Sequence, residues 1–256
     1  MACSMPRNAG YLLNIPIDRK NLSDLQQELE QSFSQAEPQI IFACANPHSI
    51  VEAQHDQAFM AALNNATTVV ADGVGVTMTA KTLGIPIGRR ITGSDYFILA
   101  MGTLNKHSGK VFFFGSTEKV LQKVASRMQR EYPNLQLAGT MSPPFGTWSD
   151  QHNKDMLEKI NKAQPDLLWV GMTAPKQEKW VEANKHELSV PVIGSIGAVF
   201  DFYAETYPRA PDWMCRLGLE WAFRFIKEPK RMWKRTIVSA PKFLMLSVWI
   251  HWIRRN

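Results

Sequence analysis

The chain alternates between short apolar runs and longer amphipathic segments through most of its length. The apolar runs are bounded by glycine, proline or asparagine, as is typical of strands that are buried on both faces of a sheet. They fall at residues 39–43, 68–71, 110–114, 135–139, 166–171 and 190–196. Segments with helical periodicity lie at residues 48–64, 75–83, 95–106, 117–131, 149–163 and 175–187. This order predicts an α/β fold in which a mostly parallel, Rossmann-like sheet is flanked by helices.

The two ends of the chain depart from this alternation. Residues 11–35 predict an edge strand and a helix that lead into the sheet. After Phe200 only helical patterns follow: residues 212–227 before Pro229, and residues 230–253, which predict one or two further helices around Pro241. We therefore divide the chain into an α/β domain, residues 1–205, and a C-terminal helical appendage, residues 206–256.

The appendage carries a charge that the rest of the chain lacks. Residues 209–256 hold eleven Lys or Arg against three acidic residues, a net charge of +8, whereas the whole chain carries +6, so residues 1–208 sum to −2. Five of the eight tryptophans also lie in this stretch. Arginine and lysine bind anionic groups and tryptophan settles at an apolar boundary, so we expect the appendage to contact an anionic membrane surface.

The sequence of the appendage does not predict a membrane-spanning helix. Its longest apolar run, FLMLSVWIHWI, has eleven residues, whereas a spanning helix needs about 20. We therefore expect the protein to lie on a membrane rather than to cross it. The N-terminal residues lack the apolar core of a signal peptide, and the three cysteines have no metal-ligand spacing. Both features predict free thiols in a reducing compartment, such as the cytoplasm.

Polar or glycine-rich turns follow five of the predicted strands. In a parallel α/β sheet, ligands bind at the carboxyl ends of the strands, where loops and helix N-termini present backbone N–H groups. We therefore expect these turns to form one site. They contain Asn46, Asp72, Gly115, Ser116, Gly171 and Gly197, the last of which leads into Asp201.

Asp72 is the carboxylate that this pattern singles out. It directly follows an apolar strand and precedes Gly73 and Gly75, which lets another molecule approach the backbone closely. A carboxylate there can act as a general base toward an acceptor hydroxyl or as a helix N-cap, and the residues alone leave both open. This turn lacks the third glycine and the later acidic residue of a dinucleotide fingerprint, which disfavours a dehydrogenase.

Two other polar groups also have a chemical and a structural interpretation. Gln177 lies in the first turn of a predicted helix, where it can bind a sugar or a phosphate or form a capping box with Glu178. The residues alone favour the capping box. Arg89 and Arg90 precede a helix N-terminus and can bind an anion, although exposed loop arginines are usually only solvated.

The sequence contains neither an Asp-x-Asp pair nor an HExxH motif, and its six histidines are scattered. We therefore expect no metal site and no cofactor. An enzyme that handles a nucleotide diphosphate without a metal must neutralise the leaving phosphates with arginine, lysine or helix dipoles. The arginines of the appendage are the obvious source.

Long motifs in the chain resemble those of the WecG/TagA/CpsF glycosyltransferases, glycosyltransferase family 26. Residues 194–235 contain RAP-x-W, GLEW-x-x-R and EP-x-R in the order that the family has. ADGVG, TGSD and PKQEKW match the family pattern upstream, so the resemblance covers roughly residues 40–236.

This resemblance implies an inverting, metal-independent glycosyltransferase of bacterial cell-surface polysaccharide biosynthesis. Such an enzyme moves a hexose or an N-acetylhexosamine, for example N-acetylmannosamine, from a UDP-sugar to an undecaprenyl-diphosphate-linked saccharide at the inner leaflet. The α/β domain would bind the UDP-sugar, and the appendage would complete the active site and contact the membrane. A nucleic acid partner is not implied, and a monomer and a homo-oligomer both remain open.

The resemblance also assigns roles to residues of this chain. Asp72 matches the catalytic base of the family. Donor binding is implied for Asn46, Gly115, Ser116, Gly171, Gly197 and Asp201. Contacts with substrate or phosphate are implied for Arg90, Gln177, Arg209, Arg216, Arg224 and Arg231.

Three positions depart from the family pattern and are expected to reshape the donor pocket. Cys44 stands where a small hydroxyl residue is frequent, and Glu205 stands where glycine is common. Residues 172–174 replace a stretch that usually carries a further glycine. The donor sugar is therefore the least defined part of the prediction.

Two other classes of protein fit parts of the sequence. One is a cytosolic nucleotide-dependent enzyme whose appendage serves as a dimerisation element, and the missing dinucleotide fingerprint disfavours it. The other is a nucleic-acid-binding module that uses the basic appendage as its phosphate footprint. The density of tryptophan and leucine there favours lipid instead.

Overall fold

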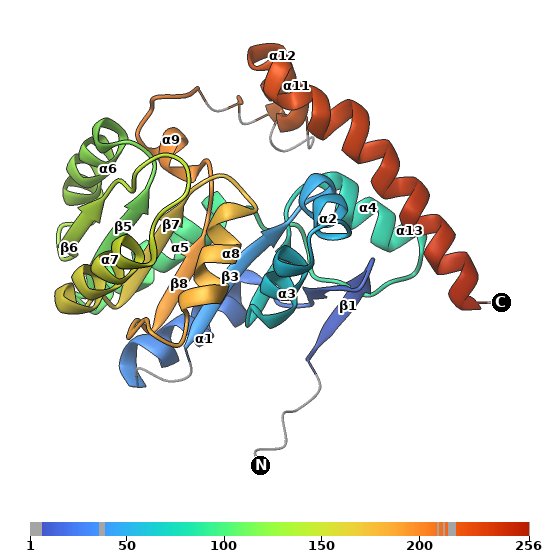
Figure 1. Cartoon of the computed structure of the whole chain (residues 1–256). Helices are drawn as coiled ribbons and strands as arrows, with labels where there is room; N and C mark the ends of the chain where they lie inside the picture. Colours follow the sequence, from blue (N-terminus) through green and yellow to red (C-terminus); the bar gives the residue numbers. More distant parts are fainter. Residues whose placement is uncertain (1–6, 36–38, 209, 212, 215–218, 256) are drawn as a thin grey trace.

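A computed structural model describes residues 7–35, 39–208, 210–211, 213–214 and 219–255. Its centre is a six-stranded parallel sheet with the strand order β4-β3-β8-β7-β5-β6 (Figure 1). The strands are β3 (Ile40–Ala45), β4 (Thr68–Ala71), β5 (Lys110–Gly115), β6 (Gln136–Met141), β7 (Leu167–Gly171) and β8 (Val192–Ser195). Each overlaps one of the six apolar runs, so the predicted α/β fold is confirmed.

Helices cover both faces of the sheet and enclose two apolar cores. One face carries α1 (Leu22–Gln35), α5 (Gly93–Lys106), α6 (Glu118–Glu131) and α9 (Val199–Tyr203). The other face carries α2 (Pro47–Ala53), α3 (Gln57–Asn65), α4 (Val74–Thr82), α7 (Asp150–Ala163) and α8 (Lys176–Asn184). Successive side chains of a strand point to opposite faces, so the neighbours Phe112 and Phe113 of β5 enter different cores.

The N-terminal segment differs from its prediction. Two short strands pair with each other in a separate antiparallel sheet, so neither is an edge strand of the parallel sheet. They are β1 (Ala9–Leu12) and β2 (Ile15–Asp18). Leu13 and Asn14 between them have positive φ, 50° and 65°, as a two-residue type I′ hairpin turn requires. Asp18 fixes the hairpin against β4, because its Oδ2 accepts a hydrogen bond from the backbone N–H of Val69 (2.6 Å).

The predicted helix over residues 48–64 is in fact two helices, α2 and α3. Asp56 separates them, because its side chain accepts a hydrogen bond from the backbone N–H of Phe59 (3.0 Å) and so caps α3. The same carboxylate forms an ion pair with Lys179 of α8 (2.8 Å). One polar residue barely alters the apolar periodicity, which is why the pattern alone predicts a single helix.

The appendage is helical, as predicted. Its described elements are α11 (Glu220–Lys227), α12 (Pro229–Trp233), the π-helical segment η1 (Lys234–Ser239) and α13 (Ala240–Arg255). Pro229 opens α12, at a position where the missing N–H of proline is not needed. Pro241 does not interrupt the helical run Lys234–Ile253, which joins η1 to most of α13 and has 20 residues. By length and composition alone, this run is apolar enough to cross a membrane, which corrects the prediction from the eleven-residue apolar run.

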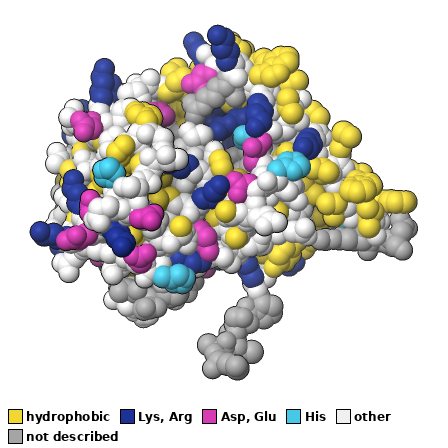
Figure 2. Space-filling view, viewed as in Figure 1, with side chains coloured by type: hydrophobic (Ala, Val, Ile, Leu, Met, Phe, Trp, Pro, Cys, Tyr) yellow, Lys and Arg dark blue, Asp and Glu magenta, His cyan; other side chains and the backbone are white. Residues whose placement is uncertain are grey.

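The last helix is apolar on two sides. One side packs on α2 and α4, where Phe243 and Ser247 are buried. The other side exposes the large apolar side chains Leu244, Met245, Val248, Trp249, Trp252 and Ile253. Apolar side chains gather along this helix in the space-filling view (Figure 2). A helix that packs along the protein surface and exposes a second apolar side is suited to an interfacial position, and the expected membrane contact stays a prediction.

Candidate active site

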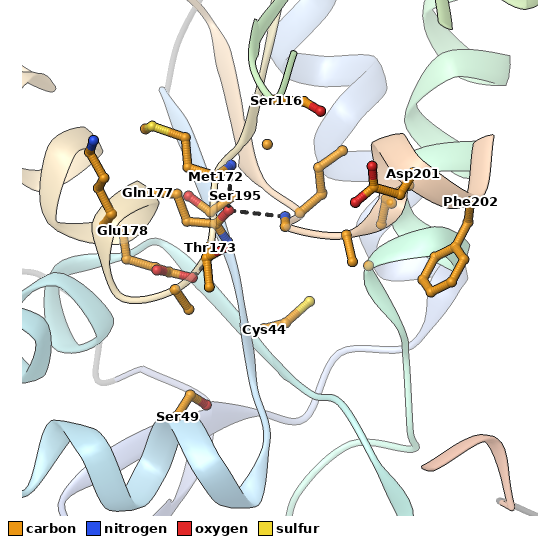
Figure 3. Close-up of a pocket in the computed structure, with 18 of the residues that line it drawn as sticks. Cys44, Ser49, Ser116, Met172, Thr173, Gln177, Glu178, Ser195, Asp201 and Phe202 are labelled. Atoms are coloured by element: carbon orange, nitrogen blue, oxygen red, sulfur yellow. Dashed lines mark hydrogen bonds between the residues drawn. The ribbon is translucent and has the colours of Figure 1, made fainter. Parts of the chain in front are cut away.

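A cavity of about 540 Å³ lies at the carboxyl ends of the parallel strands (Figure 3). The turns after β3, β4, β5, β7 and β8 contribute to its wall, together with the first turn of α8 and side chains of the appendage. The turns that the sequence predicted to form one site thus line one cavity. Predicted site residues that line the cavity are Asn46, Asp72, Ser116, Gly171, Gln177, Gly197, Asp201 and Arg224.

The remaining predicted site residues lie elsewhere. Gly115 and Arg90 do not line the cavity. Arg209 and Arg216 lie outside the described residues, and the side chain of Arg231 does too.

Asp72 is fixed at the end of β4. Its backbone N–H donates a hydrogen bond to the carbonyl oxygen of Ala45 on β3 (2.8 Å), and its half-buried side chain lines the cavity. The N-cap of α4 is the following residue, Gly73, whose φ of 105° favours glycine, and no side chain caps this helix. The N-cap interpretation of Asp72 is therefore wrong, and its carboxylate is left to the cavity.

The surroundings of Asp72 bring its pKa close to neutrality. Burial raises this pKa to about 6. The positive charges of Arg224 and Arg90 oppose the rise, whereas the negative charges of Glu220 and Asp95 add to it. Arg90 thus acts on the carboxylate through its charge although it does not line the cavity. A carboxylate with a pKa of about 6 can accept a proton at neutral pH, as a general base must.

Gln177 is buried and joins two turns of the site. Its Oε1 accepts hydrogen bonds from the backbone N–H groups of Met172 (3.1 Å) and Gly197 (3.0 Å), and its Nε2 donates to Oε1 of Glu178 (2.9 Å) (Figure 3). The N-cap of α8 is Pro175, without a side-chain hydrogen bond, so the capping box is wrong. Gln177 positions the turns after β7 and β8, and its direct contact with a substrate stays a prediction.

Asn46 has a structural role at the cavity wall. Its Oδ1 accepts a hydrogen bond from the backbone N–H of Ser49 (3.0 Å), and its own backbone N–H donates to Oγ of Ser49 (2.8 Å). This reciprocal capping box fixes the start of α2 and both side chains. The role of Asn46 in donor binding stays a prediction.

Glycines bring the turns after β5 and β7 close together. The backbone N–H of Ser116 donates to the carbonyl oxygen of Gly171 (2.9 Å). A Cβ on Gly115, whose φ is 120°, would overlap the backbone of Gly171, and a Cβ on Gly171 would overlap the ring of Phe200. Gly115 therefore has a packing role, and Gly171 combines packing with a place in the cavity wall.

Replacement of Gly171 by alanine is expected to lower the free energy of unfolding by about 1–3 kcal/mol, because the added methyl group overfills the contact with Phe200. The matched control is Gly102→Ala in α5, where no atom lies within 4 Å of an added Cβ. That control is expected to stabilise the protein by up to about 1 kcal/mol through helix propensity. Urea unfolding measures both variants, and equal effects would contradict the packing role.

Arg224 of α11 reaches the cavity from the appendage. Its guanidinium lies 4.5 Å from the centroid of the Phe202 ring and pairs with Glu220 (2.6 Å). Its Nε is buried and has no hydrogen-bond partner among the described residues. A buried cationic N–H without a partner is costly, so this group is suited to bind an anionic oxygen.

Sequence comparison decides the family. A model of the glycosyl transferase WecG/TagA/CpsF family matches residues 11–256. The chain belongs to this family. The resemblance that the motifs indicated is thereby confirmed, and the match begins upstream of the predicted start at about residue 40.

Several relatives of the chain are named N-acetylglucosaminyldiphosphoundecaprenol N-acetyl-beta-D-mannosaminyltransferase. The protein of that name from Bacillus subtilis (strain 168) is 31% identical over 235 residues, which cover 91% of this chain and 88% of the relative. Its counterpart from Bacillus spizizenii is 30% identical over 226 residues, 87% of this chain and 84% of the relative. A third, from Staphylococcus aureus (strain MW2), is 26% identical over 234 residues, 91% of this chain and 89% of the relative.

The three departures from the family pattern have different consequences. Cys44 and residues 172–174 line the cavity, and their effect on the donor pocket stays a prediction. Burial, and then the negative charge of Asp72, raises the pKa of the Cys44 thiol, so it stays protonated. Glu205 does not line the cavity, which corrects its prediction: it is exposed, pairs with Arg127 (3.0 Å), and has a φ of 52°, the left-handed region that favours glycine.

Four charged residues of the cavity wall were not predicted as site residues: Lys176, Glu178, Glu220 and Arg235. All four lie in motifs that carry the resemblance, two within PKQEKW, one within GLEW and one at the end of residues 194–235. Membership of a motif was therefore the available signal. The resemblance implies that the appendage completes the active site, but it does not imply that Glu220 and Arg235 are among the residues that line the cavity.

Proposed function

We propose that the protein transfers a sugar from a UDP-sugar to an undecaprenyl-diphosphate-linked saccharide by a single displacement with inversion. The observation that carries this proposal is the half-buried carboxylate of Asp72, with a pKa of about 6, in a cavity that Arg224 of the appendage also lines. The names of the relatives make N-acetylmannosamine the first donor sugar to test, and N-acetylglucosaminyl diphospholipid the first acceptor.

In the proposed reaction Asp72 accepts the proton of the acceptor hydroxyl. The hydroxyl oxygen attacks the anomeric carbon of the donor as the bond from that carbon to the UDP oxygen breaks, and UDP leaves with the electron pair. Arg224, together with Arg235, which also lines the cavity, neutralises the charge that develops on the leaving diphosphate. Residues 206–256 would thus complete the active site of the α/β domain without a resident metal or other cofactor.

A donor screen tests this proposal. The purified protein is incubated with a panel of UDP-sugars and a synthetic N-acetylglucosaminyl diphospholipid, and released UDP is measured. We expect one UDP-sugar to be turned over, and only in the presence of the acceptor. Absence of UDP release from every donor would contradict the proposal.

Turnover is expected to fall on the acid side of neutrality. Asp72 must be ionised to accept a proton, so kcat/KM should fall about tenfold for each pH unit below its pKa of about 6. A pH–rate profile measures this limb. An acid limb centred near the ordinary aspartate pKa of 3.8 would contradict the assignment.

Stability should change with pH in the opposite direction. Folded Asp72 and folded Glu178, with pKa values of about 6 and about 7, bind protons more tightly than the unfolded chain does. Their contribution to stability is therefore present at low pH and is lost as the pH rises through these values. The melting temperature should fall between about pH 4 and pH 7, that is, between the ordinary pKa values of the two carboxyl groups and the raised ones, and the fall should be smaller in Asp72→Asn.

We also propose that the exposed side of α13 binds the anionic inner face of the cytoplasmic membrane. Met245 and Trp249 are 73% and 59% exposed, and each large apolar side chain contributes about 2 kcal/mol when it is buried. Their joint replacement by serine should lower the affinity for anionic vesicles by about 100-fold or more in a flotation assay. Leu22→Ser, at the exposed start of α1, is the control, and equal binding of all three proteins would contradict this role.

A further inference from the structure

Glu178 lies in the wall of the cavity, and one of its two carboxyl oxygens has no hydrogen-bond partner among the described residues. The residue is only 6% exposed. Its Oε1 accepts the hydrogen bond from Nε2 of Gln177 (2.9 Å), whereas its buried Oε2 has no partner among the described residues. A buried polar atom without a partner costs free energy, and a ligand that hydrogen-bonds it recovers that cost.

The neighbouring lysines do not neutralise Glu178. Lys176 donates to a backbone carbonyl (2.8 Å), and its Nζ lies 4.1 Å from the centroid of the Trp148 ring. Lys179 pairs with Asp56 (2.8 Å). Within the described part of the chain, no lysine or arginine forms an ion pair with Glu178. This end of the cavity therefore disfavours a phosphate and favours a neutral polar group.

Arg224, the arginine of α11 in the cavity wall, lies away from Glu178. Arg224 stacks on Phe202, 4.5 Å from the ring centroid. Figure 3 shows Phe202 and Glu178 on opposite sides of the cavity. A diphosphate bound at Arg224 would therefore leave the sugar attached to it free to extend toward Glu178.

We propose that Oε2 of Glu178 hydrogen-bonds a hydroxyl group of a substrate sugar and so sets which sugar the cavity accepts. Gln177 orients the carboxyl group by holding its other oxygen. Burial raises the pKa of Glu178 to about 7, so near neutral pH the group is available both as an acceptor and as a donor. The inference rests on the proposed function, in which the donor and the acceptor both carry a sugar on a diphosphate.

The test combines variants of the protein with altered substrates. Glu178→Ala is expected to lower kcat/KM by about 10- to 100-fold. The substrates are two series, one of donors and one of acceptors, in which each sugar hydroxyl is replaced by hydrogen in turn. With the unaltered protein, one deoxy substrate should lower kcat/KM by about as much as Glu178→Ala lowers it with the normal substrate. With Glu178→Ala, the same deoxy substrate should cause no further loss in kcat/KM. The series that contains this substrate identifies the sugar that Glu178 contacts.

Two further variants separate recognition from folding. Glu178→Gln keeps the size of the side chain and an acceptor for Gln177, so it should remain folded and should show a smaller loss than Glu178→Ala. Glu182→Gln, on the same helix and paired with Lys185 outside the cavity, is the control and should match the unaltered protein.

The outcomes distinguish the inference from the proposed function. Suppose that the unaltered protein transfers sugar, but that for every deoxy substrate the combined loss in kcat/KM equals the product of the loss from Glu178→Ala and the loss from the deoxy substrate. The two changes are then independent, so the inference is overturned and the proposed function stands. Activity of Glu178→Ala equal to that of the unaltered protein has the same meaning. If the unaltered protein turns over none of the donors, the proposed function fails and the inference fails with it.

Discussion

Replacement of Asp72 by asparagine is expected to lower kcat by about 10²- to 10⁴-fold, because general-base assistance contributes that much to a transfer reaction. The amide cannot accept the proton of the acceptor hydroxyl. It occupies the same volume and keeps the backbone hydrogen bond to Ala45, so the turn after β4 should keep its shape. The affinity for UDP, measured by calorimetry, should change little.

The matched control is Asp150→Asn, which removes the same charge from the exposed first turn of α7. This variant should retain full turnover. Near-normal kcat in Asp72→Asn would remove Asp72 from the role of base. A parallel loss of UDP affinity and melting temperature would show that the carboxylate is needed for structure instead.

Replacement of Arg224 by alanine is expected to lower kcat by about 10²-fold or more, because it removes a preorganised cation from the leaving diphosphate. The affinity for UDP should fall as well, since the buried Nε, which has no partner among the residues that the structure describes, would no longer be available to a phosphate oxygen. Arg224→Lys should restore only part of the activity, because an ammonium group has neither the planar fork nor the stacking surface that lies on Phe202.

Lys230→Ala is the control for Arg224. It removes the same charge from an exposed position in α12, outside the cavity wall. Its kcat and UDP affinity should match those of the unaltered protein. Equal losses in the two variants would mean that the appendage acts through its overall charge, and activity of Arg224→Ala within twofold of normal would exclude Arg224 from the site.

The sheet was predictable because its strands are buried on both faces. Strands such as β5 and β7 have apolar side chains on both faces, so each appears in the sequence as a continuous run. The errors have local causes. The hairpin turn depends on positive φ at Leu13 and Asn14, and the break between α2 and α3 depends on the Asp56 cap. Such features involve one or two residues and leave the apolar periodicity nearly unchanged.

The site was predictable to the extent that it follows from the topology of the sheet. Parallel strands end at one edge, so Asp72 and Ser116 were expected in the same cavity, and they line it. The contacts of individual side chains, and the chemistry that follows from them, were harder to predict from the sequence. Gln177 and Glu178 are adjacent in the sequence, and only the fold shows that Gln177 joins two turns while one oxygen of Glu178 has no hydrogen-bond partner in the described part of the chain.

The anomeric configuration of the product tests the central claim most directly. Unaltered protein is incubated with the donor selected in the screen and with N-acetylglucosaminyl diphospholipid, and the isolated lipid is analysed by mass spectrometry and NMR. A single displacement with Asp72 as base predicts one added sugar, with a configuration opposite to that of the donor, and a greatly reduced yield from Asp72→Asn. Retention of the donor configuration, or release of UDP with the lipid unchanged, would contradict it.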